Sequence, residues 1–337
     1  MYVSDYLYEV PNHLIAQYPS AKRQDARLLV LTRTTGHIEH RFFKDLLLYL
    51  KEGDLLILND SKVMPVRLKG IDKNGKDREL LLKERLGDNR YAILFKGRYS
   101  GAVSFSDSLK GEIKSGSEIV FIYDGDLEEK LQELGAMPLP PYIKRQPEEQ
   151  DKIRYQTVYA KEHGSIAAPT AGLHFTEDLL NAIRQKGVIV KTVTLHVGTG
   201  SFRPIKSDII QSHKMDSECF EITLDTIKTI KEVKDSGAMV FLVGTTSVRT
   251  LESYFSGNYV AFPSSKEKIK GKTDFFIYPG YKFNVPDALI TNFHQPASTP
   301  LLLASAFAGK EFLFKAYREA IEHSYRFFSY GDAMLVL

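Results

Sequence analysis

Two units in the second half of the chain repeat the same order of elements, and this repeat constrains the fold more than any other feature. The first unit predicts a helix that begins after Thr176 and ends at Gly187, followed by an apolar strand over 188–197. Thr is a favoured N-cap, acids follow it in the first turn, and Gly ends the helix. The second unit has a helix that ends at Gly237 and a strand over 238–243. This alternation predicts an α/β layer with parallel strands.

The remaining segments follow two patterns. Apolar strands over 54–58 and 288–291 end in polar residues and extend the α/β layer, and helical segments over 301–324 follow them. Residues 66–146 instead carry short apolar runs separated by glycines, with a hairpin signal at Asn74-Gly75, which is typical of a small all-β barrel. The predicted domains are an α/β domain over 1–65 and 147–337, with a mixed or parallel sheet and flanking helices, and an inserted β-barrel domain over 66–146.

Composition narrows the possible chemistry. The single cysteine, Cys219, allows no intramolecular disulfide, no four-cysteine zinc site and no three-cysteine iron–sulfur site, and it suits a reducing compartment. The net charge of +3 excludes a polybasic tail protein. The N-terminus lacks a basic signal-peptide region, and the longest apolar run, 301–308, is far shorter than the roughly 18 residues of a membrane span. We therefore expect a cytoplasmic protein without a membrane segment.

Small and polar residues follow the predicted strands at the point where each strand ends. In an open α/β sheet, ligands bind at the carboxyl ends of the strands, so these segments predict one composite site. The segments are 59–62, 196–203, 244–249 and 291–294, together with 167–176, which leads into a helix.

Histidines in these segments are the candidates for acid–base chemistry. A lone histidine is more often structural, but His174, His196 and His294 lie in three different segments, which favours proton transfer by at least one of them. His213, between the two repeated units, is open to either interpretation. The turn at 244–249 could hold a carboxylate or phosphate on its backbone N–H groups, or could simply cap a helix.

Other sites have weak support. No HExxH pattern is present, and His37 and His40 merely flank a glutamate, so no metal site is predicted. The glycines at 198 and 200 lack the third glycine of a dinucleotide fingerprint. Between 266 and 272 every second residue is a lysine, and Phe262 is close in sequence. This pattern is typical either of a segment that binds single-stranded RNA or of a solvated lysine loop.

Longer motifs run along the whole chain in order. They are IAQYP at 15–19, GDLLILNDSKV at 53–63, LPPYI at 139–143, APTAGLHFT at 168–176, HVG at 196–198, GTTSVRTLE at 244–252, DALITNFH at 287–294, SAFAG at 305–309 and YRFFSYGDAM at 325–334. With these motifs the chain resembles the S-adenosylmethionine:tRNA ribosyltransferase-isomerases of queuosine biosynthesis.

The resemblance implies an α/β domain with an inserted β-barrel. It implies that the ribosyl unit of S-adenosylmethionine is transferred to 7-aminomethyl-7-deazaguanine at the wobble position of tRNA and isomerised, which gives epoxyqueuosine and releases adenine and methionine. S-adenosylmethionine is then a consumed substrate, and neither a cofactor nor a metal is expected. The expected partners are S-adenosylmethionine and the tRNA anticodon loop, and the chain is expected to be a monomer. The lone cysteine agrees with polar chemistry, because radical use of S-adenosylmethionine needs a three-cysteine cluster.

The reaction suggests roles for the candidate residues. The sulfonium acidifies the neighbouring 5′ C–H bond, so the hypothesis is that His174 or His196 removes this proton. His213, Asp287 and Asp332 are the candidates for an acid or an orienting group. The candidate substrate-binding residues are Asn59, Asp60, Thr170, Gly172, Gly198, Arg203, Gly244, Thr245, Thr246, Arg249, Asn292, His294 and Tyr330. The departures from the family pattern flank the motifs and are Ser61, Ser201, Gln295, Ala297 and Pro300.

Two alternatives stay open at this point. A nucleotide-sugar or glycosyl transferase could use the same strand ends, and it would not depend on S-adenosylmethionine. An RNA-binding module would bind tRNA through the barrel without turnover.

Overall fold

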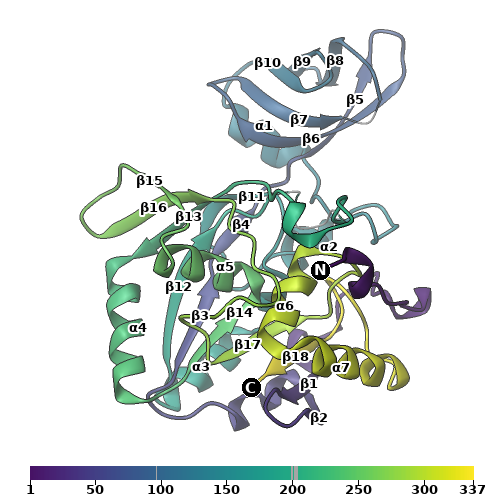
Figure 1. Ribbon diagram of the computed structural model, residues 1–337. Coiled ribbons are helices and arrows are strands. Elements are labelled where there is room, and N and C mark those ends of the chain that lie inside the picture. Colours follow the sequence, from purple (N-terminus) through teal and green to yellow (C-terminus); the bar gives the residue numbers. More distant parts are fainter. Residues whose placement is uncertain (96, 199, 201–203) are drawn as a thin grey trace.

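The computed structural model describes residues 1–95, 97–198, 200 and 204–337. A large α/β domain carries a closed β-barrel at one end (Figure 1). The central sheet has ten strands in the order β15-β16-β13-β12-β3-β14-β17-β18-β1-β2. Both parallel and antiparallel neighbours occur in it, so the prediction of an α/β fold with a mixed or parallel sheet and an inserted barrel is confirmed, with a mixed sheet.

Four parallel strands form the middle of the sheet. They are β12 (Ile189–Leu195), β3 (Leu55–Asn59), β14 (Val240–Val243) and β17 (Ala288–Asn292). On one side lie β13 (Glu218–Thr223), β16 (Lys268–Thr273) and β15 (Val260–Phe262), which are antiparallel. On the other side lie β18 (Ala333–Val336), β1 (Arg27–Thr32) and β2 (His37–Phe42). Parallel strands bring their carboxyl ends to one edge, which is where the polar motifs follow.

Alternating side chains of the strands build one core on each face of the sheet. Leu55 and Ile57 face a core that includes residues of α4 (Leu224–Ser236), α5 (Gly244–Phe255), α6 (Thr299–Ala308) and α7 (Lys310–Glu322). Leu56 and Leu58 face the other core, which is covered by α3 (Glu177–Gln185) and the 3-10 helix η4 (Phe43–Leu48). The period of two along β3 thus accounts for its continuous apolar sequence, because both faces are buried.

The predicted helix signals act as expected. The Thr176 hydroxyl accepts a hydrogen bond of 3.2 Å from the Leu179 N–H at the start of α3. Gly187 and Gly237 follow α3 and α4 with φ angles of 84° and 78°, a conformation that glycine adopts without strain. The two helix–glycine–strand units therefore lead into β12 and β14, which both pair with β3.

The inserted segment forms a closed antiparallel barrel with strand order β10-β7-β6-β5-β8-β9. Its strands are β5 (Arg67–Asp72), β6 (Asp77–Arg85), β7 (Arg90–Phe95), β8 (Gly101–Ser106), β9 (Leu109–Lys114) and β10 (Glu118–Tyr123), and α1 (Leu127–Leu134) packs against them. The hairpin predicted at Asn74-Gly75 joins β5 to β6, with φ of 75° at Gly75.

A short sheet connects the barrel to the α/β domain. The chain leaves β3 through β4 (Ser61–Val63) and enters the barrel directly, and β4 pairs with β11 (Glu162–Ser165) on the return path after α2 (Glu149–Arg154). The barrel therefore lies on the side of the sheet where the parallel strands end (Figure 1). Among the described residues, no helix has the length and apolar character needed to cross a membrane.

Candidate active site at the strand ends

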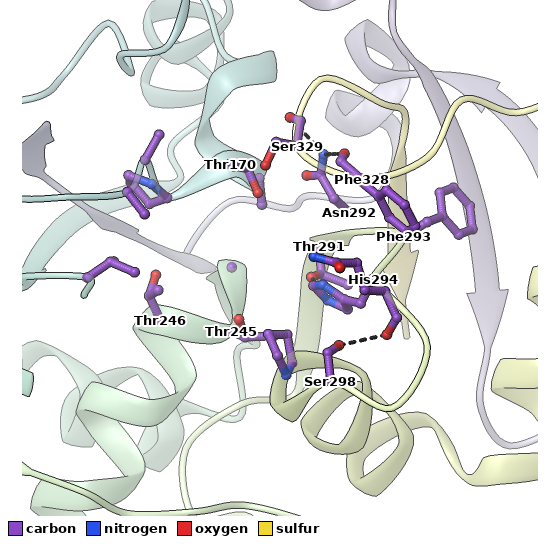
Figure 2. A pocket seen from close by; sticks show the side chains of 18 of the residues that line it. Thr170, Thr245, Thr246, Thr291, Asn292, Phe293, His294, Ser298, Phe328 and Ser329 are labelled. Atoms are coloured by element: carbon purple, nitrogen blue, oxygen red, sulfur yellow. Dashed lines mark hydrogen bonds between the residues drawn. The ribbon is translucent and has the colours of Figure 1, made fainter. Parts of the chain in front are cut away.

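One pocket lies where β12, β14 and β17 end, and it encloses about 640 Å³ of space when its open mouth is included. Its walls come from 167–171, 244–246, 291–295 and 328–329, with Tyr142, Val197, Ser298 and Pro300. Of the five polar segments predicted to converge, four contribute at least one lining residue, and the segment 59–62 does not. Figure 2 shows Thr170, Thr245, Asn292 and His294 around this pocket, on different elements.

Two helices begin at the pocket. α5 starts at Gly244, directly after β14, and Thr245 and Thr246 line the wall. α6 begins after Ser298, whose hydroxyl accepts a hydrogen bond of 3.4 Å from the Leu301 N–H. Helix N-termini carry a partial positive charge and free N–H groups, so they favour a bound anion. The Thr246 hydroxyl is buried and has no hydrogen-bond partner among the described residues, which leaves it available to a ligand.

The opposite wall is polar and held in place by hydrogen bonds (Figure 2). The Asn292 amide donates to the Phe328 carbonyl at 2.9 Å, and its Oδ1 lies 3.3 Å from Nε2 of His174. His294 Nε2 lies 2.8 Å from the Thr291 hydroxyl. These contacts fix the orientation of the two side chains, Asn292 and His294, that a ligand in the pocket would meet.

Burial keeps His174 and His294 neutral. It lowers the pKa of His174 to about 4 and that of His294 to about 3. Neutral imidazoles can form hydrogen bonds with uncharged rings and hydroxyls at pH 7, but such low pKa values make them weak proton acceptors. His174 does not line the main pocket; it lies behind Asn292, in a smaller cavity that it shares with Tyr330.

His196 follows β12 and directly precedes Val197 of the pocket wall. Its Nδ1 atom is buried without a hydrogen-bond partner among the described residues, and burial lowers the pKa of the ring. Asp60 belongs to the same neighbourhood, and its carboxylate accepts a hydrogen bond of 2.7 Å from the Thr194 hydroxyl. Burial raises the pKa of Asp60. His196 and Asp60 therefore form a second group of titratable side chains, beside the pocket.

Arg249 is surrounded by partners from the protein itself. Its guanidinium donates to the carbonyls of Phe275, Asp216 and Thr273 and forms a buried ion pair with Glu218. The other oxygen of Glu218 accepts a hydrogen bond of 2.7 Å from the N–H of Gly198. Arg249 thus connects α5 to the segment after β12. It does not line the main pocket, but it lines a smaller cavity beside it that includes Thr245 and Thr246.

Three further candidates have structural partners. Asn59 ties β3 to β12, because its Oδ1 accepts from the Leu195 N–H at 3.1 Å and its amide donates to the Leu195 carbonyl. Tyr330 donates to Asp151 at 2.7 Å. Gly172 lies in the 3-10 helix η5 (Thr170–His174), where a Cβ atom would come within 2.0 Å of the Tyr159 hydroxyl.

The remaining candidates are not brought into the pocket. Asp287 precedes β17, at the opposite end of the strand, and accepts from the Val240 N–H at 2.9 Å. Asp332 accepts from the N–H groups of Arg27 and Arg326 and holds the turn before β18. His213 packs edge-on against Phe276, with ring centroids 5.2 Å apart. Arg203 and Ser201 lie outside the described residues.

Several pocket residues were not among the candidates. They are Tyr142, Gln295, Ser298, Pro300, Phe328 and Ser329. Tyr142 follows two prolines in the return segment from the barrel, and its hydroxyl lies 2.5 Å from the Ser329 hydroxyl. The LPPYI and YRFFSYGDAM motifs were the available signal, but nothing in the sequence shows that segments so far apart meet.

Comparison with known proteins identifies the family. A family model described as a queuosine biosynthesis protein matches residues 3–336. The chain belongs to this family. Relatives named S-adenosylmethionine:tRNA ribosyltransferase-isomerase, from Thermodesulfovibrio yellowstonii and Halothermothrix orenii, are 50% and 49% identical to it, each over 100% of both chains.

A solved structure supports the same relationship. The crystal structure of an S-adenosylmethionine tRNA ribosyltransferase from Thermotoga maritima is 34% identical in sequence, with a TM-score of 0.57 over 99% of this chain and 100% of that one. The family resemblance expected from the motifs is therefore confirmed, and six of the nine motif segments contribute residues to the pocket wall.

Proposed function

We propose that the chain is an S-adenosylmethionine:tRNA ribosyltransferase-isomerase in queuosine biosynthesis. The observation that carries this function is the identity of about 50% over the full length of relatives with that name. The reaction moves the ribosyl unit of S-adenosylmethionine onto 7-aminomethyl-7-deazaguanine at the tRNA wobble position. It gives epoxyqueuosine and releases adenine and methionine.

The lining of the pocket offers polar groups that suit S-adenosylmethionine. We assign the methionine carboxylate to the N-termini of α5 and α6, where Thr245 and Thr246 present hydroxyl and backbone donors. The Ser298 hydroxyl caps α6 and donates to the Gln295 carbonyl at 2.7 Å. We assign the uncharged rings and ribose hydroxyls to the opposite wall, where Asn292 and the neutral His294 offer directional hydrogen bonds.

Of the two candidate bases, we place His196 in the proton-transfer role. Its buried Nδ1 has no partner in the described structure, and the next residue, Val197, lines the pocket, whereas His196 itself does not. His174 is instead a positioning residue, because its Nε2 contacts Asn292 and its pKa of about 4 makes it a weak base. The 5′ C–H proton of the sulfonium substrate would move to His196, and adenine would leave with help from a separate acid.

We also propose the setting in which the reaction takes place. S-adenosylmethionine is consumed, and the polar chemistry needs neither a cofactor nor a metal. The anticodon loop of the precursor tRNA is the second substrate, the chain acts as a monomer, and the cytoplasm is its compartment.

The test is one incubation with two readouts. The full chain is mixed with S-adenosylmethionine and an anticodon stem-loop that carries the 7-aminomethyl-7-deazaguanine base. Mass spectrometry should find a ribosyl-derived adduct on that base, and chromatography should find free adenine in equal amount. A stem-loop with guanine at the wobble position is the control. Folded protein that yields neither product would contradict the proposed function. An adduct formed without S-adenosylmethionine would favour a glycosyl transferase.

Substitutions then separate the two histidines. His196→Ala should lower adenine release at least ~100-fold, as expected for loss of a general base. His174→Ala should weaken turnover less and should change KM, because it acts through Asn292. His13→Ala, an exposed histidine, is the matched control. Near wild-type turnover in His196→Ala would reject the proton-transfer role.

A further inference from the structure

Three side chains, one from β2 and two from the end of α7, gather at one place on the molecule. His40 comes from β2, and Glu319 and His323 come from α7 and its C-terminal cap. One nitrogen or oxygen atom from each lies within 4.8 Å of the other two. None of the three lines the pocket at the strand ends. We propose that this trio is a zinc-binding site that ties the outer strand of the sheet to α7.

The spacing of the three side chains is compatible with a shared metal ion as well as with ion pairs. Glu319 Oε1 lies 3.3 Å from Nε2 of His40 and 3.4 Å from Nδ1 of His323. Charge-assisted N–H···O⁻ hydrogen bonds are shorter, at about 2.7–2.9 Å. Zinc bonds of about 2.0–2.2 Å in a tetrahedron separate neighbouring ligand atoms by about 3.3–3.5 Å. The carboxylate thus stands at the distance from both imidazoles that a shared zinc ion would impose.

The ring of His40 is already oriented for such a role. Its Nδ1 lies 2.8 Å from the hydroxyl of Tyr325, which is fully buried, and this contact turns Nε2 toward Glu319. Metal-bound histidines commonly use the second ring nitrogen in this way. Arg27, the cation beside the group, is directed away from it: its guanidinium stacks 3.7 Å from the Tyr325 ring and donates to the His323 carbonyl.

The third ligand needs only a local adjustment. His323 Nδ1 is also 3.0 Å from the Glu319 carbonyl, and the side chain is 48% exposed, so the ring can turn and present either nitrogen. The centroid of its ring already lies 4.4 Å from the ring centroid of His40. Two imidazoles and one carboxylate form a donor set that zinc accepts, whereas calcium and magnesium prefer oxygen ligands alone. A fourth position would remain for water.

The position of the site indicates a structural role. β2 is the last strand of the sheet and pairs only with β1 among the described strands. His323 ends α7, and the chain then runs through Tyr325 to Phe328 and Ser329 in the pocket wall. An ion held by β2 and α7 would therefore stabilise both an open sheet edge and the base of the segment that reaches the pocket.

The test measures zinc binding by the chelator-treated full chain. Calorimetric titration with Zn²⁺ should give one ion per chain, and Tm should rise with zinc concentration and level off, because the ion binds the folded state. His40→Ala and His323→Ala should each weaken binding more than ~10-fold, and Tyr325→Phe should weaken it about 10-fold by freeing the His40 ring. Cobalt(II) should give the intense visible absorption of a tetrahedral site.

The matched control is His37→Ala, which removes an exposed histidine from the same strand. It should bind zinc as the unaltered chain does. The proposal is overturned if the chain shows no saturable binding, if His323→Ala binds as tightly as His37→Ala, or if Cys219→Ser abolishes binding, which would move the site elsewhere.

Discussion

At the scale of single residues, burial decides what the histidines beside the pocket can do. The sequence marks His174, which precedes a helix, and His294, which follows a strand, as acid–base candidates, yet burial lowers the pKa of both far below 6.5. A sequence shows that a histidine follows a strand, but not how much water reaches it. The lowered pKa values are therefore a property of packing, and they have a measurable effect on stability.

This effect gives a pH dependence of unfolding. In the unfolded chain both histidines bind a proton near pH 6.5, whereas the folded chain keeps His174 neutral until about pH 4 and His294 until about pH 3. The unfolded state thus binds more protons below pH 6.5, so stability falls as the pH falls from 6.5 toward 4. His174 alone should account for as much as ~3 kcal/mol.

Urea unfolding at pH 7 and at pH 4.5 measures this loss of stability. His174→Gln should unfold with a smaller difference between the two pH values than the unaltered chain. The same substitution at His13, which is exposed, should leave the difference as it is. An equal pH difference in His174→Gln and the unaltered chain would show that His174 is not held neutral.

The role of Arg249 depends on contacts with residues that are distant in the sequence. Its place in GTTSVRTLE, after a strand and at the start of a helix, predicts a substrate contact. The structure gives it partners on β13 and β16 and in the segments beside these strands, including Glu218, whose pKa burial raises. Those partners are more than 20 positions away in sequence, so no local pattern shows them.

Arg249→Met should therefore act on stability. It leaves the Glu218 carboxylate buried without its cation, which costs about 3–5 kcal/mol in the free energy of unfolding. Glu218→Gln combined with Arg249→Met should cost less than the sum of the two single changes, because no buried charge remains. Denaturant unfolding checks both statements. A stable Arg249→Met chain with a raised KM for S-adenosylmethionine would instead support a substrate contact.

At the scale of elements, η5 shows why a motif can depend on one small residue. The segment carries Thr170 into the pocket wall and His174 behind Asn292. Gly172, between them, has an ordinary backbone conformation, but a Cβ atom there would lie 2.0 Å from the Tyr159 hydroxyl and 2.8 Å from Thr157. The glycine is needed for close approach.

Gly172→Ala should then displace η5 and lower both stability and adenine release. Overpacking of this kind costs typically ~1–3 kcal/mol. Adding Tyr159→Phe to Gly172→Ala removes the nearest atom and should restore part of the lost stability. The ring carbon at 3.0 Å still limits the space for the new methyl group. Gly87→Ala, where the nearest atom is 3.9 Å away, is the control and should change little. Thermal unfolding with an adenine assay compares the four chains. Full activity in Gly172→Ala would contradict the argument.

Helix caps and the four parallel strands of the sheet can be predicted from the sequence, whereas strands on either side of them, such as β18 and β16, cannot. Thr176, Gly187 and Gly237 act through local hydrogen bonds and backbone conformation, so their signals are complete within a few residues. β18 is four residues long and pairs with β1, some 300 positions earlier. β16 contains lysines that suggested an RNA contact or a loop, but Lys268 and Lys270 pair with Glu221 of β13. Long-range pairing decides these elements.

At the scale of the whole molecule, the barrel and the sheet have separate apolar cores. Leu68, Leu80 and Phe121 belong to a cluster confined to the barrel strands and α1, while Leu56 and Phe241 belong to a cluster of the sheet. The sequence shows this division in the change from helix–strand units to short glycine-bounded runs. Separate cores predict that the two parts lose structure independently.

Hydrogen exchange can measure this independence. Leu80→Ala removes a buried side chain of the barrel core and should cost about 2–5 kcal/mol there, which corresponds to amide exchange at least ~30-fold faster in 67–123. Amides of β3, β14 and β17 should keep their protection, because none of their side chains belongs to that core. Leu56→Ala, in the sheet, is the matched control and should give the reverse pattern. Faster exchange in both parts after either substitution would mean that barrel and sheet unfold as one cooperative unit, and that the barrel depends on the α/β domain for its stability.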